Sequence, residues 1–156
     1  LSGIAPIVYT EATQVSSTKH QEIQRWSLFL ERAIQANAIL VGSRNKTESL
    51  LGTYSHASRV AMMLPLAQTW KSDIMELCTY VGVPIEITES SKRADPECGR
   101  PKQLADLPFQ VVDTFLASLS GEMLDAIVAP TKIQEQYLRS ILQKNSFKQN
   151  LPLSPQ

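Results

Sequence analysis

The stretch from Ala38 to Leu51 constrains the fold of this chain more than any other. It opens with four apolar residues, Ala-Ile-Leu-Val, a run of strand length that ends at Gly42. The residues that follow have the composition of a helix start. A uniformly apolar strand is typical of a parallel sheet that is covered on both faces. We therefore expect an α/β fold in which a buried strand is followed directly by a helix.

The turn between this strand and helix is a candidate ligand site. In parallel α/β folds, ligands collect at the carboxyl ends of the strands, where backbone amides of the following turn can face phosphate oxygens. Gly42 and Ser43 occupy that turn. Glu48 falls in the first turns of the expected helix, where a carboxylate is compatible with the helix dipole and could hold a hard cation.

The rest of the chain contains one more candidate strand and several amphipathic segments. Residues 4–9 are apolar and β-branched, which favours a strand. Apolar residues at three- and four-residue spacing predict helices near 21–34, 69–81 and 107–119, and from 131 to 142. We expect the second of these helices to bury Ile74, Leu77, Cys78 and Val81. Two strands are too few for a covered parallel sheet, so the predicted sheet is incomplete in this chain.

Composition favours one compact domain over residues 1–156, with a polar, proline-rich tail at 145–156. Apolar residues make up 43% of the chain, and 15 Lys and Arg balance 15 Asp and Glu. Because the charges balance, the chain as a whole has no electrostatic attraction to nucleic acid or to an anionic membrane. The sequence contains neither a membrane-spanning run nor a signal peptide, so we expect a cytoplasmic protein.

Several motifs, in order, resemble those of the NAD synthetase family, amide ligases of the adenine-nucleotide pyrophosphatase type. Residues 42–48, Gly-Ser-Arg-Asn-Lys-Thr-Glu, resemble the family's Gly-Thr-x-Asn-Lys-Ser-Glu. Further matches are Leu64-Pro65-Leu66 with Lys71, the segment 77–84, Ala94-Asp95 and Ser146-Phe147-Lys148. Upstream, Arg25 matches a family arginine. The resemblance covers about 21–152, the C-terminal two-thirds of the family domain, and implies a Rossmann-like parallel sheet flanked by helices.

The resemblance implies ATP-dependent amidation of deamido-NAD. ATP would adenylate the nicotinate carboxylate with loss of pyrophosphate, and ammonia, free or derived from glutamine, would displace AMP. The implied cofactors are ATP and Mg²⁺, and the implied assembly is a homodimer. Gly42, Ser43, Lys71 and Arg93 would bind ATP or its phosphates, and Glu48 would hold magnesium. The other implied substrate-binding residues are Arg25, Asn45, Asp95 and Lys148.

The chain also departs from the family pattern. The family's pyrophosphate loop, Ser-Gly-Gly-x-Asp-Ser, does not occur in these residues. Met62 stands where the family has an aspartate that is associated with the nicotinate end of the substrate. Two alternatives therefore stay open. One is a non-catalytic, truncated or diverged member that dimerises or binds nucleotide, and the other is a related ATP-pyrophosphatase with another carboxylate substrate.

Overall fold

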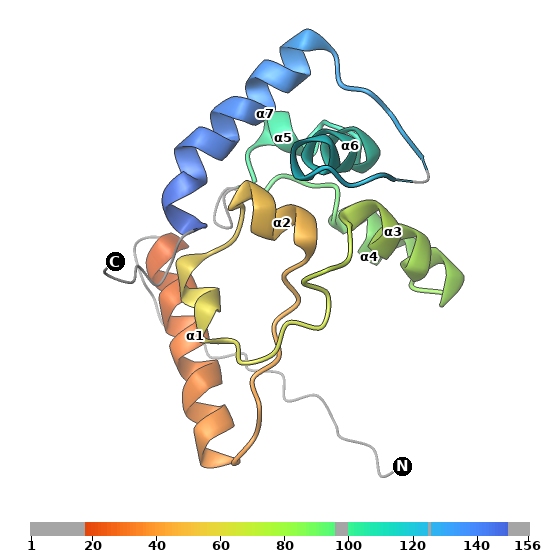
Figure 1. The fold of residues 1–156 in the computed structure, drawn as a ribbon. Helices are drawn as coiled ribbons and strands as arrows, with labels where there is room; N and C mark the ends of the chain where they lie inside the picture. The colour runs from red at the N-terminus through yellow and green to blue at the C-terminus, as the bar shows by residue number, and fades with distance from the viewer. Residues whose placement is uncertain (1–17, 96–99, 125, 150–156) are drawn as a thin grey trace.

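The computed structural model describes residues 18–95, 100–124 and 126–149. These residues form short and medium-length helices joined by extended loops (Figure 1). In chain order the helices are α1 (Thr18–Gln35), α2 (Lys46–Leu51), the 3-10 helix η1 (His56–Val60), α3 (Lys71–Tyr80), α4 (Ile85–Ser90), α5 (Lys102–Ala105), α6 (Phe109–Ser120), α7 (Lys132–Asn145) and the 3-10 helix η2 (Ser146–Lys148).

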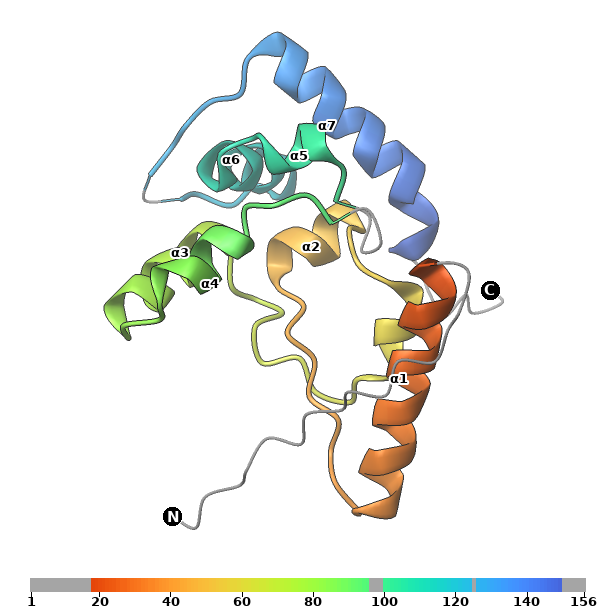
Figure 2. The same ribbon diagram turned by 180° about the vertical axis from the view of Figure 1, so that it is seen from behind.

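The hydrophobic core forms where α2, α6 and α7 meet. Helix α2 contacts both longer helices as well as α3, and Figures 1 and 2 show it in the middle of this group from both sides. Phe115 and Leu116 of α6 and Leu138 of α7 are almost completely buried there. Helix α1 packs instead on η1. The molecule therefore has a helical core with a second unit, α1 and η1, beside it.

The expected parallel sheet is absent from the described residues, which corrects the α/β prediction. The apolar run at 38–41 makes one isolated parallel bridge, between Val41 and Met63, and the only other bridge in the described residues joins Asp95 and Arg100. The composition of the run predicts a covered strand, but within the described residues it makes only this one bridge, and the side chains of Ile39 and Val41 are more than half exposed. The second predicted strand, at 4–9, lies outside the described residues.

The helix predictions agree better with the structure. Helices α1, α3, α6 and α7 lie where the spacing of apolar residues predicts them. Helix α7 begins with a capping box, in which Thr131 and Gln134 each bond the other's backbone N–H. The predicted buried face of α3 is wrong, because Leu77 and Val81 are at least half exposed. Helical periodicity identifies an apolar face, but it does not show whether another element packs on that face.

Candidate functional site

Most of the residues predicted around the turn at Gly42 line one cavity. The cavity has a volume of about 210 Å³ and lies between α1 and the segment from Gly42 to Leu64. Four predicted site residues, Arg25, Gly42, Ser43 and Glu48, are in its wall. Tyr54, Ser55 and Ser58 add hydroxyl groups from the same segment.

A buried carboxylate orders the α1 side of this cavity. Glu22 is 5% exposed and accepts hydrogen bonds from Arg25 Nη2 and, at 2.7 Å, from Trp26 Nε1. The ion pair holds the Arg25 guanidinium beside the cavity. Because Glu22 partly offsets this positive charge, Arg25 alone does not make the cavity cationic.

The opposite wall is fixed by the start of α2. Asn45 is the N-cap, and its Oδ1 accepts from the Glu48 N–H at 2.9 Å, while Glu48 Oε2 accepts from the Asn45 N–H at 3.2 Å. Asn45 is buried, so the structure places it as the residue that orients Glu48. Gly42 is needed for packing, because a Cβ there would lie 2.8 Å from Leu64 Cδ2. Its N–H donates to the Met63 carbonyl at 2.9 Å.

Three cations lie close to the ring of Tyr54, a residue that lines the cavity. The Arg44 guanidinium carbon lies 4.2 Å from the ring centroid, Lys148 Nζ 5.3 Å and the Arg59 guanidinium carbon 5.6 Å. Arg59 Nη2 also donates to the Tyr54 hydroxyl at 2.7 Å. The buried Arg44 Nε has no hydrogen-bond partner in the part of the chain that the structure describes. Arg44 also lines the cavity, and a guanidinium group there is suited to an anionic ligand.

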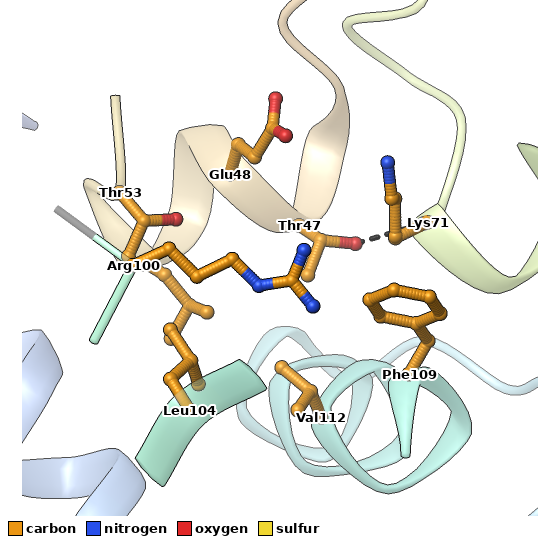
Figure 3. A pocket seen from close by; sticks show the side chains of 9 residues that line it. Thr47, Glu48, Thr53, Lys71, Arg100, Leu104, Phe109 and Val112 are labelled. Carbon is orange, nitrogen blue, oxygen red and sulfur yellow. Dashed lines mark hydrogen bonds between the residues drawn. The ribbon is translucent and has the colours of Figure 1, made fainter. Parts of the chain in front are cut away.

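Lys71 lines a second, smaller cavity of about 30 Å³ together with Arg100 (Figure 3). Both cations lie against the ring of Phe109, with Lys71 Nζ 5.6 Å and the Arg100 guanidinium carbon 4.9 Å from its centroid. Glu48 lines both cavities. Burial lowers the pKa of the Arg100 guanidinium, and the charges of Glu48 and Asp95 oppose that shift.

A buried hydrogen-bond network positions both cavities relative to α6. Asp113 is fully buried, and its Oδ1 accepts from Thr47 Oγ1 at 2.5 Å. Its Oδ2 accepts from the Ser72 N–H at 2.8 Å and from Ser72 Oγ at 2.7 Å. Thr47 Oγ1 in turn accepts from the Lys71 N–H at 2.9 Å. One carboxylate thus ties the first turns of α2 and α3, with Glu48 and Lys71, to one helix.

The other predicted site residues lie apart from the larger cavity wall. Arg93 is exposed after α4, and Asp95 pairs its backbone with Arg100 in both directions at 2.8 Å. Lys148 donates from Nζ to the carbonyls of Gly52 and Tyr54, at 2.8 Å each. The structure thus places Lys148 beside the segment after α2, where it fastens η2 to that segment.

Sequence reasoning missed Arg44, Arg100 and Asp113. Arg44 occupies the free position of the motif at 42–48, and Arg100 lies in the segment 90–104, where basic residues and prolines predict a loop without a motif. Asp113 could have been identified from the sequence, because it is the one acidic residue among Val111, Val112 and Phe115 on an apolar helix. A charged residue within a buried face needs internal partners.

Glu48 is a suitable single protein ligand for magnesium. Mg²⁺ is usually held by one or two carboxylates together with water and substrate phosphates. The described residues contain no group of three or more His, Cys, Asp or Glu side chains that could form a cage. Glu48 faces a cavity that also contains Arg25 and Arg44, and these could bind the phosphates. A metal shared with a ligand therefore suits this site better than a protein-only metal centre.

Comparisons with known proteins identify the family. The family model described as NAD synthase matches residues 7–152. The NH(3)-dependent NAD(+) synthetase of Helicobacter pylori (strain J99) is 27% identical over 139 residues, which are 82% of this chain and 53% of that protein. The synthetase of Fusobacterium nucleatum subsp. nucleatum is 31% identical over 114 residues, 72% of this chain and 44% of that protein.

The match to the NAD synthase model spans nearly the whole chain, and the chain belongs to that family. Among solved structures, an NMN synthetase from Francisella tularensis has a TM-score of 0.66 at 22% identity, covering 88% of this chain and 55% of that one. The chain spans about half the length of the relatives it matches. No helix in the described ranges is long and apolar enough to cross a bilayer.

Proposed function

We propose that this chain forms the nucleotide-binding part of a ligase that converts deamido-NAD to NAD. ATP adenylates the nicotinate carboxylate and releases pyrophosphate, and ammonia then displaces AMP. The observation that carries the proposal is the cavity shared by Arg25, Ser43, Arg44 and Glu48. Two of these side chains, Arg25 and Arg44, carry guanidinium groups, which bind phosphate oxygens through paired hydrogen bonds.

Each wall of the cavity has a role in this proposal. Arg44 and Arg25 bind phosphate oxygens, and Glu48 holds Mg²⁺ against the same phosphates. Magnesium supplies the charge that stabilises the departing pyrophosphate. Lys71 and Arg100 add positive charge in the neighbouring cavity, which Glu48 also lines. Cations and a metal around the phosphates are what adenylation chemistry needs, because negative charge builds up on the leaving group.

Binding of Mg-ATP and of deamido-NAD to the full chain, measured by calorimetry, tests the cavity directly. Arg44→Gln removes the guanidinium and should weaken binding about tenfold or more, the loss expected for one charge-assisted hydrogen bond. Arg139→Gln is the matched control, because Arg139 pairs with Glu135 on the exposed face of α7. Equal affinities for the wild type and Arg44→Gln would refute this assignment of the cavity.

Turnover separates ligation from binding. The chain is incubated with Mg-ATP, ammonia and deamido-NAD, and AMP and pyrophosphate are measured. The alternative is a member that binds nucleotide or dimerises without catalysis, and the observation that favours it is the exposed, apolar Met62 at a position where the family pattern has an aspartate. Nucleotide binding without AMP release from this chain would support that alternative. The homodimer implied by the family stays a prediction, which light scattering of the same sample tests.

A different substrate is the second alternative, and Met62 favours it. Met62 is exposed and apolar at the position where the family pattern has an aspartate. The likeness to an NMN synthetase suggests the deamidated form of NMN as the substrate to compare with deamido-NAD. AMP release with the mononucleotide and not with the dinucleotide would decide for this alternative.

A further inference from the structure

Glu48 lies in the wall of both cavities, and among the described residues it is the one carboxylate that does so. No lysine or arginine of the described residues forms an ion pair with it. Its Oε2 accepts from the Asn45 N–H at 3.2 Å, which orients the side chain at the start of α2 without cancelling its charge. The carboxylate therefore keeps its negative charge for a ligand.

Positive charge nevertheless outweighs negative charge around Glu48. In the larger cavity one arginine is offset by its ion pair with Glu22, whereas Arg44 makes no ion pair within the described residues. In the smaller cavity Lys71 and Arg100 add two more positive charges, and no second acidic residue from the described part of the chain lines its wall. Three cations thus remain around a single carboxylate.

Arg100 is held in place by three contacts. Its Nη1 donates to the Ser91 carbonyl, its guanidinium carbon lies 4.9 Å from the centroid of the Phe109 ring, and its backbone pairs with Asp95. The side chain is partly buried, so salt and water screen its charge less than that of an exposed arginine. A guanidinium keeps its proton in a protein, so the cavity that Glu48 lines has a permanent positive charge (Figure 3).

We propose that Arg100 makes Glu48 select a divalent cation that arrives with a polyphosphate over the free ion. This inference rests on the proposed function, in which Glu48 holds magnesium. A free divalent ion brings two more positive charges to a site that already has an excess of them, and repulsion weakens its binding. A polyphosphate brings more negative charge than the metal cancels, so the same arginine attracts the complex. The site takes its metal together with its anionic ligand and not before it.

Manganese binding to the full chain tests this selectivity without turnover. Mn²⁺ is given alone, with inorganic tripolyphosphate, or with an ATP analogue in which a methylene group replaces the oxygen between the α and β phosphates. Water-proton relaxation distinguishes Mn²⁺ on the protein from the free ion and from its complex with the phosphates alone. We expect the Mn²⁺ complex of tripolyphosphate to bind about tenfold or more tightly than free Mn²⁺.

Substitutions at Arg100 separate its charge from its packing. Arg100→Gln should tighten the binding of free Mn²⁺ about threefold or more and should weaken the binding of the tripolyphosphate complex by a similar factor. Damage to the fold would weaken both, so opposite signs identify an effect of charge. Arg100→Lys keeps the charge and should bind free Mn²⁺ as weakly as the wild type. Lys102→Gln is the control, because Lys102 is exposed and lines neither cavity, and it should change neither affinity.

The wild type alone provides the first decision, and circular dichroism verifies that the variants fold. Free Mn²⁺ that binds as tightly as the tripolyphosphate complex would overturn the proposal. So would an Arg100→Gln variant that does not bind free Mn²⁺ more tightly, or an Arg100→Lys variant that gains as much affinity as Arg100→Gln. Mn²⁺ binding that survives Glu48→Gln would overturn both this inference and the proposed metal site. Binding of the tripolyphosphate complex but not of the ATP-analogue complex would refute the proposed ligase function and support the selectivity of Glu48.

Discussion

Asp113 connects the elements of the site through a single side chain. Its carboxylate accepts three hydrogen bonds from Thr47 and Ser72, and no part of it reaches solvent. Asp113→Asn keeps the size of the side chain but turns an NH₂ group toward donors that need an acceptor. We expect it to lower the free energy of unfolding by about 1.5–3 kcal/mol, the usual worth of a hydrogen bond to a charged group. Urea denaturation measures the difference.

Asp106→Asn is the control for this prediction. Asp106 is exposed at the end of α5, so its replacement should change the free energy of unfolding by no more than about 0.5 kcal/mol. Equal stabilities for the two variants would mean that the Asp113 network does not hold α2 and α3 to α6.

His56 makes a second prediction, of pH dependence. The pKa of His56 lies below its ordinary value of 6.5. Partial burial is the main cause, and the positive charges of Lys148 and Arg59 add to it. The folded chain therefore binds this proton less readily than the unfolded chain. This contribution to stability is complete above pH 6.5, and it is lost as the pH falls through the folded-state pKa. Unfolding measured between pH 7.5 and 5 should show the loss, and His56→Gln should remove it.

The ring of Phe147 allows a test of what lowers the pKa of His56. It stacks on the His56 ring with centroids 5.3 Å apart. Phe147→Leu should reduce the burial and bring the pKa of His56, measured by NMR titration, back toward its ordinary value. An unchanged pKa would assign the shift to the neighbouring charges alone.

At the scale of the element, the end of α2 depends on Gly52. Its φ of 67° lies in the left-handed region, and a Cβ there would lie 2.6 Å from Asn145 Cβ. Gly121, at the end of α6, has a similar φ of 72° but no heavy atom within 4 Å of the same position. Gly121→Ala should cost about 1–2 kcal/mol for its backbone conformation alone. Gly52→Ala should cost clearly more, and equal thermal shifts would contradict the clash.

Local sequence signals were enough to predict the main helices. Thr131 and Gln134 specify the start of α7, and the spacing of Val112, Phe115 and Leu116 specifies the buried face of α6, because caps and periodicity act within a few residues. The strand at 38–41 and the buried face of α3 depend on partners that are remote in sequence. The periodicity of a segment does not show whether the elements that would pack against it are present.

In the candidate site, too, the residues with local sequence signals could be predicted, and those that depend on contacts remote in sequence could not. The motif at 42–48 indicated Ser43 and Glu48, and the structure places both at one cavity. Arg25 reaches that cavity from α1 through its pairing with Glu22, a contact within one helix. Asp113 and Thr47 are 66 positions apart, so their contact follows from the packing of α2 on α6 and from no local pattern.

At the scale of the whole molecule, the two units should differ in stability. Half of the residues of α6 are buried, whereas Ala33 is the only apolar residue of α1 buried within the described residues. Local opening free energies follow buried contact. We expect the amides of α1 to exchange about 100-fold faster than those of α6 in native-state hydrogen exchange. Equal protection in the two helices would mean that the chain unfolds as one unit.

The two tryptophans of the chain have separate surroundings. Trp26 lines the larger cavity, and its indole N–H is bound to Glu22, while Trp70 lies in the hydrophobic core. The chain therefore contains its own optical reporter. Emission from Trp26 should change when a ligand enters the cavity, and emission from Trp70 should change only when the core melts. Replacing either indole with phenylalanine assigns the two signals, so occupancy and unfolding can be followed separately in a single cuvette without a dye.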